Sequence, residues 1–595
     1  MDRLIDTTSP KAMFPDLPTL HFGPSIDTCP DCVQRLTVAK TRTKTVATLA
    51  IGRFRAHEIM RGCKHCENPT TYRSEELLRL AAHRCNFGYD ILVHVGISIF
   101  LGYRSETEIR LELERYNVPI SASEVAYLAK KFIVYLALAH KESRERIRSF
   151  MNRQGGYILH LDATCEGDSP HLMIGLDGMS EIVLENIKLP SEKADKIIPF
   201  LRDIKKLYGQ PRALVHDMGA GILNAVREVF PDTPDYICHF HFLRDIGNDL
   251  LGKQYDKLRA RLRKHGIQGV LRKRAREFKQ VIDTQPSLVD AFQENLKTKK
   301  LQGPCVGQIP IVTAYSLVLW ALEGKKEGQG YGFPFDQAHL AFYERLGVIY
   351  ATLNKVNQIK LRKDRRDNKP YVKIIRDLYS PMNDAVLAKT ATEMRERIAV
   401  FDRLRQAMRI ALPDGHAGLN DDGEQTDIHT IESRVKKFHH WLSHKKTLSK
   451  KDDYKSMIAQ IEKYWDKLFA DPIIVDTPHG QVTIQPQRTN NVLERLFRDM
   501  KRGYTRRRGT SSLNKTLKAM LADTPLVKNL QNEDYVKIIL NGTTSLEQRF
   551  AQIDANTVRE ELIKSKSDQE IVSPWMKRLI KNPDFIRDLS ATFAL

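Results

Sequence analysis

The spacing of hydrophobic positions changes several times along the chain, and each spacing predicts a different kind of element. Between about residues 155 and 240, short apolar runs bounded by turn residues are typical of strands, and two longer stretches have helical spacing. The predicted elements are strands at 156–163, 171–177 and 181–188, a helix at 192–207, a strand at 212–217, a helix at 222–229 and a strand at 235–238. Three consecutive strands followed by alternating helices and strands predict a mixed sheet with helices on its faces.

Helical spacing dominates on both sides of this segment. Residues 91–101 are apolar at helical spacing, and Ser105 and Ser121 each precede a glutamate by three residues, which is the spacing of a capping box. A short helix, a tight turn and a capped second helix predict a helix-turn-helix, whose second helix could enter a major groove of DNA. An ordinary helical bundle that joins two domains is the alternative.

Downstream, residues 243 to about 470 have an almost wholly helical pattern. The apolar stretch from Ile309 to Leu322 is broken by polar residues and is too short to span a bilayer, so we expect a buried helix there. A strongly basic helix is predicted from about Asn490 to Arg502, and residues 520–595 have a helical pattern of mixed charge that indicates no role.

Length and charge narrow the class of protein. A chain of 595 residues is too long for one core, so three to five domains are expected. Lysine and arginine number 94 against 73 aspartates and glutamates, which gives a formal net charge of +21. A polyanionic partner is the natural interpretation, and a merely soluble basic protein is the alternative. The first residues lack a basic and then apolar signal, so we expect a cytoplasmic protein, nucleoid-associated if prokaryotic, without a membrane partner.

Two Cys-x-x-Cys pairs near the start of the chain predict a metal site. Cys29 and Cys32 form the first pair, and Cys63 and Cys66 form the second. Strand-like segments at 35–39 and 45–51 lie between the pairs, and paired knuckles joined by short strands can place four thiolates tetrahedrally around one structural Zn²⁺. His57 or His65 could replace one cysteine ligand.

Two predicted strands end in aspartates, Asp162 and Asp217, and Glu494 lies on the basic helix. Hard divalent cations such as Mg²⁺ prefer oxygen ligands, and two of them about 4 Å apart can support an in-line attack on a phosphodiester. An aspartate at a strand end is also a common turn residue or helix cap. The competitors near Asp162 are Glu166, Asp168 and Asp177. The last two lie in turn-like sequence, so Asp162 at the end of an apolar strand is preferred.

The residues around Glu494 and a second motif complete the pattern. Thr489, Asn490 and Asn491 precede Glu494 and are ordinary N-cap residues, a role that is compatible with Glu494 facing a site one turn later. Cys238 and His241 lie in the segment Cys-His-Phe-His-Phe-Leu-Arg, and two such ligands alone rarely hold zinc.

In this order, the motifs resemble the DDE transposases of the ribonuclease H-like superfamily, in particular the Mutator-like element group and its bacterial insertion-sequence relatives. The resemblance covers about 155–250 and 486–510. Residues 238–244 are similar to the Cys-x-x-His motif of that group with its trailing arginine, and residues 489–494 are similar to its Thr-Asn-x-x-Glu helix. The family often has asparagine after that arginine, where this chain has Asp245.

The resemblance implies a fold and a mechanism. The fold would be multidomain α/β and α: a ribonuclease H-like mixed sheet with helices on both faces, interrupted by a large helical insertion and preceded by a zinc ribbon and a helix-turn-helix. Asp162, Asp217 and Glu494 would bind two Mg²⁺ or Mn²⁺ ions, hydrolyse a strand at the transposon end and transfer the 3′-hydroxyl to target DNA. Cys238 and His241 would be structural. A homodimer or higher oligomer on DNA is expected.

Basic residues just after Glu494 would contact phosphates of the double-stranded partner, which comprises terminal inverted repeats and target DNA. They are Arg495, Arg498, Lys501, Arg502, Arg506, Arg507 and Arg508. A solvated basic face is the alternative. Two rival functions remain open: a domesticated DNA-binding regulator without catalysis, and a ribonuclease H-like nuclease that cuts without joining.

The expected domains follow from these patterns. They are an N-terminal arm with a zinc-ribbon-like domain (1–84), helix-turn-helix-like DNA-binding helices (85–150), the first part of the catalytic domain (151–250), a helical insertion (251–470), the second part of the catalytic domain with the glutamate helix (471–520) and a C-terminal helical region (521–595).

Overall fold

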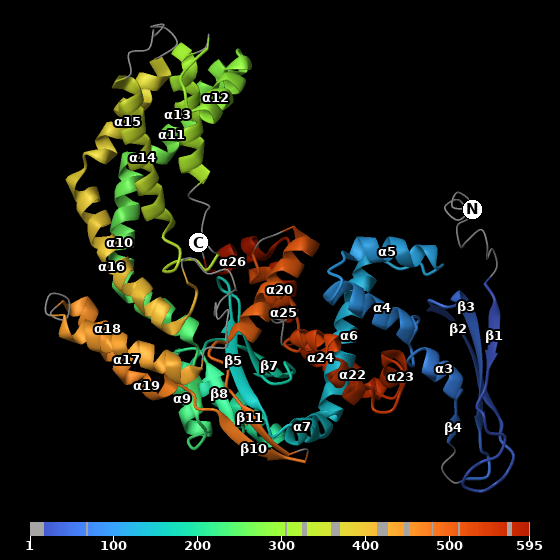
Figure 1. Ribbon diagram of the computed structural model, residues 1–595. Helices are drawn as coiled ribbons and strands as arrows, with labels where there is room; N and C mark the ends of the chain where they lie inside the picture. The colour runs from blue at the N-terminus through green and yellow to red at the C-terminus, as the bar shows by residue number, and fades with distance from the viewer. Residues whose placement is uncertain are drawn as a thin grey trace. The chain divides into compact units, whose positions relative to one another are not determined.

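A computed structural model describes residues 17–66, 70–303, 306–323, 330–358, 369–412, 427–445, 451–478, 480–509, 512–567 and 574–593 (Figure 1). Residues 1–16 of the expected N-terminal arm therefore lie outside the described residues. The chain forms two compact units. The first contains Met1–Tyr236 and Pro472–Leu595, and the second contains Ile237–Asp471.

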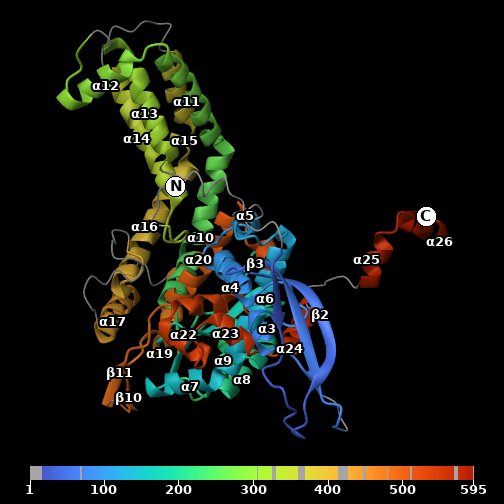
Figure 2. The ribbon, with the colours of Figure 1, turned by 90° about the vertical axis from the view of Figure 1, so that its right-hand side faces the viewer.

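The first unit begins with a small sheet, in which β2 and β3 form a long ribbon (Figure 2). β3 (Gly52–Gly62) pairs antiparallel with β2 (Thr37–Thr48) and parallel with β1 (Thr19–Phe22), and the short β4 (Thr71–Tyr72) also joins it. The strands predicted at 35–39 and 45–51 are wrong in their bounds, because one strand covers most of both. β3 was not predicted, because arginine or another polar residue at every second position gives it no apolar run.

One face of this sheet is covered by the helix α3 (Glu75–Leu80). Val46 of β2, Phe54 and Ala56 of β3 and Leu77 of α3 are fully buried and pack in one cluster. Phe54, Ala56 and Met60 of β3 therefore point toward the side of α3. Lys40, Arg42 and Lys44 of β2 lie on this same side, because their register partners are Met60, Glu58 and Ala56.

Four helices follow: α4 (Tyr89–Phe100), α5 (Glu106–Arg115), α6 (Ala122–Glu142) and α7 (Arg144–Arg153). The predicted capping box is confirmed, since Ser105 Oγ accepts from the N–H of Glu108 at 3.3 Å and the Glu108 carboxylate accepts from the N–H of Ser105 at 2.7 Å. Ser121 caps α6 through the N–H of Glu124 at 3.2 Å.

α6 is buried on every side from Lys131 to His140. A helix that reads a groove needs a solvent-exposed face, so the predicted helix-turn-helix could use only the first turns of α6, where Ala122 to Glu124 and Tyr127 are exposed. Beyond Tyr127, the exposed residues of α6 are Lys130, Lys141 and Glu142.

A five-stranded mixed sheet forms the centre of the first unit, with the strand order β7-β6-β5-β8-β9. β5 pairs antiparallel with β6 and parallel with β8, while β6 also pairs antiparallel with β7. The bounds are β5 (Ile158–Thr164), β6 (His171–Asp177), β7 (Val183–Leu189), β8 (Ala213–His216) and β9 (Asp235–Ile237), with the helices α8 (Ala194–Tyr208) and α9 (Ala220–Val229) between them. The predicted strands and helices agree with these elements to within a few residues.

The two faces of this sheet are covered differently. Leu159, Leu161 and Leu214 share the main core cluster with α8 and α9. On the other face, Ile158, Ala213 and Val215 pack against Val475 and Ile484. These two residues belong to a hairpin of β10 (Ile473–Thr477) and β11 (Gly480–Ile484), so a strand hairpin packs on the second face.

The chain after the hairpin stays in the first unit. The elements are α20 (Asn491–Arg508), α21 (Asn514–Ala519), η2 (Thr524–Gln531), α22 (Glu533–Leu540), α23 (Leu546–Ala551), α24 (Ala555–Ser567), α25 (Pro574–Ile580) and α26 (Phe585–Phe593). Phe550 of α23 packs on the rings of Phe132 and Tyr135 of α6, at centroid distances of 5.7 and 5.2 Å. Residues beyond 520, whose sequence indicated no role, therefore complete the core around α6.

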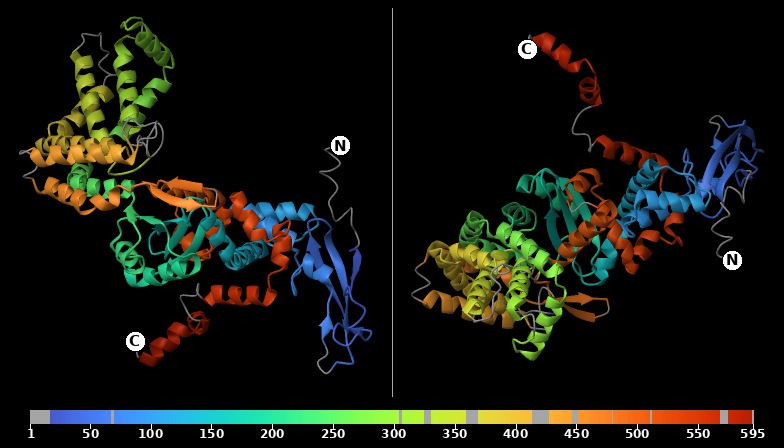
Figure 3. Two further views of the ribbon diagram at one scale, coloured as in Figure 1. Left: turned by 60° about the horizontal axis from the view of Figure 1, so that its bottom comes forward. Right: turned by 90° about the horizontal axis from the view of Figure 1, so that it is seen from above.

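The second unit is helical throughout its described residues, as the pattern over 243–470 predicts (Figure 3). Its elements are α10 (His239–His265), α11 (Ile267–Asp283), α12 (Ser287–Thr298), η1 (Val306–Gln308), α13 (Ile309–Glu323), α14 (Ala338–Gln358), α15 (Lys369–Met382), α16 (Ala385–Met408), α17 (Ile428–His444), α18 (Asp452–Lys463) and α19 (Trp465–Leu468).

The segment Val306–Glu323 is long and apolar enough to cross a membrane, whereas the sequence pattern predicted a segment too short to do so. One such helix among the described residues is weak support for a span, because core helices pass the same test. Ile311, Ala314 and Val318 of α13 are fully buried in the core of the second unit, as expected for a core helix.

Candidate functional site

The register of β5 and β8 brings the two predicted aspartates to one edge of the sheet. Leu161 pairs with His216 in parallel register, so Asp162 and Asp217 are the next residues on two neighbouring strands. Side chains alternate along a strand, and Ile158 and Val215 pack on the face opposite α8. The same alternation places Asp162 of β5 on that face, and Asp217 directly follows β8.

Local hydrogen bonds orient both carboxylates. Asp162 is buried, with 7% exposed, and its Oδ1 accepts from the N–H of Ala163 at 2.8 Å. Asp217 is half-buried, and its Oδ1 accepts from the N–H of Gly219 at 3.0 Å, at the start of α9. A Cβ at residue 219 would lie 3.1 Å from Asp217 Oδ1, which is tighter than ordinary contact, so glycine suits this close turn.

A buried amide ties the glutamate helix to the strand of Asp162. Asn490 Nδ2 donates to the backbone oxygen of Leu161 at 2.8 Å, and Asn490 Oδ1 lies 2.9 Å from Nδ1 of His160. His160 and Asn490 are both fully buried. Asn490 is the N-cap residue of α20, but its side chain makes no capping bond, so the expected capping role of that side chain is wrong. We call this arrangement the Asn490 clamp.

The histidine of the clamp is neutral near pH 7. Burial lowers the pKa of His160 to about 4. With Asn490 Oδ1 as acceptor, His160 carries its proton on Nδ1. Gly178 lies against the ring, because a Cβ at residue 178 would be 2.4 Å from His160 Cδ2. Packing against Gly178 therefore fixes the imidazole of His160, and the hydrogen bond from the imidazole fixes the side chain of Asn490.

Glu494 lies one helical turn beyond the clamp. Its N–H donates to the backbone oxygen of Asn490 at 3.0 Å, and its side chain is half-buried. Asn490 bonds to the residue just before Asp162, so the clamp fixes the first turn of α20 at the end of β5. The three carboxylates thus all lie in the first unit. Among the described residues, their oxygen atoms do not all lie within 4.8 Å of one another, as the four cysteine sulfur atoms do.

The three competing carboxylates have other partners. Asp177 is fully buried and accepts from the N–H groups of Ile158, Met179 and Ser180 at 3.1–3.2 Å. Glu166 accepts from the N–H of Leu513 at 2.8 Å. Asp168 accepts from Lys518 at 2.6 Å and from Asn514 at 2.8 Å, and the Lys518 ammonium is the main cause that lowers the pKa of Asp168 to about 2. Each of them stabilises a turn or an element junction.

The basic residues of α20 fall into two groups. Arg498, Lys501, Arg502, Arg506 and Arg508 are exposed. Arg495 pairs with both oxygens of Glu181 at 2.7 Å. The Arg507 side chain is only 6% exposed and pairs with Glu106 at the start of α5. Arg507 lies between two other arginines, so the sequence does not indicate that its side chain is buried.

Cys238 and His241 lie at the start of α10 and are both buried, with 1% and 6% exposed. They belong to the second unit, whereas Asp162, Asp217 and Glu494 belong to the first. Among the described residues, they are not members of a group of three metal-ligand atoms. Their burial is compatible with the structural role that the resemblance implies.

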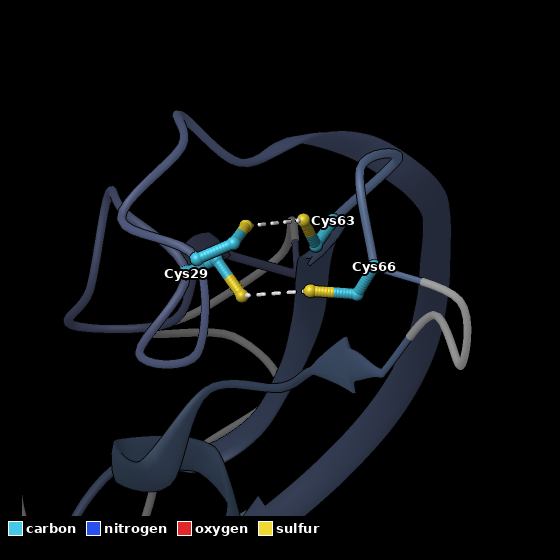
Figure 4. Close-up of side chains that lie close together, drawn as sticks. Cys29, Cys63 and Cys66 are labelled. Atoms are coloured by element: carbon cyan, nitrogen blue, oxygen red, sulfur yellow. Dashed lines mark hydrogen bonds between the residues drawn. The ribbon is translucent and has the colours of Figure 1, made fainter.

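The four cysteines of the N-terminal sheet form a cluster that could bind a zinc ion (Figure 4). Their Sγ atoms all lie within 4.8 Å of one another, with Cys29 and Cys66 at 3.7 Å and Cys32 and Cys63 at 3.3 Å. A tetrahedral ion with Zn–S bonds of about 2.3 Å requires sulfur atoms about 3.8 Å apart, so the donors fit.

The cluster consists of the four cysteines and contains neither His57 nor His65. The backbone N–H of His65 lies 3.4 Å from Cys63 Sγ, and the ring of His57 bonds to Thr43 at 3.0 Å. The N–H of Cys32 is the main cause that lowers the pKa of Cys29 to about 6, which favours a thiolate. Thiolates are the form that binds zinc.

Comparisons with known proteins add little. No protein-family model matches the chain, and a search of the curated proteins gives no match. Among solved structures, the chain is similar to the Drosophila P element transposase strand transfer complex, with 9% sequence identity and a TM-score of 0.28 over 83% of this chain and 96% of that one. A score at this level establishes neither a shared fold nor a shared activity.

Proposed function

We propose that this protein is a DNA transposase of the DDE type, which hydrolyses transposon ends and transfers the 3′-hydroxyl to target DNA. One observation carries the proposal: Asp162 lies near the end of β5, Asp217 directly follows the neighbouring parallel strand β8, and the Asn490 clamp fixes the helix of Glu494 to β5. The three residues are far apart in the sequence, so a sheet edge that collects them supports a shared role.

The carboxylates would hold two Mg²⁺ or Mn²⁺ ions, because hard divalent cations prefer such oxygen ligands. When bound, these ions would activate the attacking oxygen and stabilise the leaving oxygen of the phosphodiester. The chain's own residues position the ligands. The N–H of Ala163 orients Asp162, the N–H of Gly219 orients Asp217, and the clamp sets the first turn of α20.

The exposed basic residues of α20 would bind the DNA backbone beside the carboxylates. Arg498, Lys501, Arg502, Arg506 and Arg508 follow Glu494 on one helix, and their charges favour phosphates without reading sequence. Arg495 is held by Glu181 and Arg507 by Glu106, so we assign these two residues to the packing of the helix. The partner would be double-stranded DNA, as terminal repeats and as target, bound by a homodimer or higher oligomer.

Catalysis is tested by replacing one carboxylate at a time at nearly constant shape. Asp162→Asn, Asp217→Asn and Glu494→Gln should each abolish cleavage and joining and leave DNA binding intact. Asp168→Asn is the matched control, because this nearby carboxylate is exposed and bonds to α21. If one of the first three variants cleaved within about tenfold of the unchanged protein, which is about 1.4 kcal/mol of barrier, that residue would be misassigned.

The joining step separates the two enzymatic functions. A donor duplex that already ends in the cut 3′-hydroxyl is incubated with target DNA and Mg²⁺ or Mn²⁺. Joined products are expected from the transposase, whereas cleavage without joined products would identify a ribonuclease H-like nuclease. Specific binding without either reaction would identify a non-catalytic regulator.

A further inference from the structure

The outer face of the N-terminal sheet carries a row of basic and hydroxyl side chains. Along β3, every second residue from Gly52 to Gly62 is buried, and the residues between them are exposed or half-buried. The series between the buried positions contains Arg53, Arg55, His57, Ile59 and Arg61, and Arg61 pairs with Asp27. The alternation is complete, so these side chains share the face opposite α3.

The neighbouring strands extend this row sideways. Thr43 and Thr45 of β2 are the register partners of His57 and Arg55, and His21 of β1 is the partner of His57 from the other side. Thr43 Oγ1 lies 3.0 Å from His57 Nδ1, and the rings of His21 and His57 are 5.0 Å apart. We define these residues, Arg53, Arg55, His57, Thr43, Thr45 and His21, as the outer face.

The outer face has no acidic member. The sequences of β1, β2 and β3 contain one acidic residue, Glu58. It is buried on the inner face, where Arg73 bonds to both of its oxygens at 3.0 and 2.7 Å. Neither Arg53 nor Arg55 has an ion pair within the described part of the chain. Their charges are therefore not neutralised by the sheet.

We propose that the outer face binds the sugar-phosphate backbone of double-stranded DNA. The proposal rests on the proposed function, because it names the surface that holds the DNA partner. Arginine side chains and threonine hydroxyls are common phosphate contacts. A β-ribbon can lie along a groove of B-DNA.

The dimensions of the ribbon match a duplex. β3 has 11 residues. At about 3.3 Å per residue it spans about 36 Å, close to one helical turn of B-DNA at about 34–36 Å, and the outer face from Arg53 to His57 covers about 13 Å of it. Residues that share the face lie about 6.6 Å apart, near two base-pair rises of about 3.4 Å each. The contacts would follow the backbone and would not depend on sequence.

The experiment measures the salt dependence of duplex binding by the full-length protein without Mg²⁺ or Mn²⁺, so the result does not depend on the carboxylates. Arg53→Ala with Arg55→Ala should reduce the slope of log affinity against log salt by about 1.8, since each lost phosphate contact removes about 0.9. The loss of affinity should be the same for DNA duplexes of unrelated sequence. Arg53→Lys with Arg55→Lys should restore the slope.

Lys196→Ala with Lys206→Ala is the charge-matched control, because both lysines are exposed and lie on α8, outside the N-terminal sheet. This pair should leave the slope unchanged. Zinc content and thermal unfolding of each variant establish that the sheet is folded.

Three results would overturn the proposal. They are an unchanged slope in the arginine variant, a loss of affinity confined to one DNA sequence, and a larger loss of binding to single-stranded RNA than to duplex DNA. If the duplex result is as expected while all carboxylate variants still cleave, the outer face stands and the catalytic assignment fails.

Discussion

Replacing Asn490 by alanine tests the link between the buried clamp and the catalytic geometry. Asn490 is fully buried, and the substitution leaves two backbone or side-chain groups without partners: the oxygen of Leu161 and the Nδ1–H of His160. A buried polar group that loses its partner costs about 1–3 kcal/mol, so we expect a loss of about 2–6 kcal/mol in the free energy of unfolding. The first turn of α20, which carries Glu494, would lose its attachment to β5.

The chain contains a matched control for this experiment. Asn529 is 1% exposed, and its side chain donates to the oxygen of Val183 at 2.8 Å and accepts from the N–H of Val183 at 2.8 Å. It ties η2 to β7 with the same number of buried hydrogen bonds, on a strand two places from β5. Asn529→Ala should therefore destabilise the first unit by a similar amount without moving Glu494.

The two variants are compared by urea unfolding and by Mn²⁺-dependent DNA cleavage at a temperature where both remain folded. Asn490→Ala should cleave at least tenfold more slowly than Asn529→Ala, a difference of at least about 1.4 kcal/mol of barrier, and should require more Mn²⁺ for half-maximal rate. Equal cleavage by two equally destabilised variants would refute the reasoning, because the clamp would then contribute stability alone.

Three further outcomes are expected. Cys29→Ser with Cys32→Ser should reduce the zinc content from about one ion per chain to none, as measured by elemental analysis. The same variant should lose DNA binding by the N-terminal sheet in a binding titration while the rest of the protein stays folded. Full DNA binding by zinc-free protein would contradict this prediction. Arg506→Ala with Arg508→Ala should weaken binding to all duplexes and lower the salt slope by about 1.8, whereas a changed sequence preference at constant slope would indicate base readout. The folded-state pKa of His160 is lowered to about 4. The unfolded chain therefore binds more protons below pH 6.5, and stability should decrease by about 2 kcal/mol from pH 7 to pH 5 in urea titrations, less in His160→Gln.

Much of the central sheet could be predicted from the sequence. The first half of β5 and the whole of β8 are buried apolar runs, with Asp162 near the end of β5 and Asp217 directly after β8. The capping serine Ser105 was recognisable because a cap depends on residues three apart. Interactions between residues that are close in the sequence can therefore be recognised from a short sequence pattern.

The parts that were missed depend on contacts between distant segments. β3 is half-exposed and rich in arginine, so its strand character is visible only in its pairing with β2. Asn490 has the composition of an N-cap, yet its amide bonds to β5, 329 and 330 residues away in sequence. The one available signal was His160, a polar residue inside an otherwise apolar strand. Likewise, Arg507 belongs to a basic run, and its partner Glu106 is 401 residues distant.

The sequence separation across the Asn490 clamp has a consequence during synthesis. A ribosome that adds about 5–20 residues per second needs roughly 16–66 s to advance the 330 residues from His160 to Asn490. Throughout that interval β5 exists without its clamp, and Ile158 and Val215 lack the cover of Val475 and Ile484. A nascent or prematurely terminated chain therefore holds the two aspartates but no positioned Glu494. Under the proposed function, such a chain would bind DNA through the N-terminal sheet before it could cut DNA.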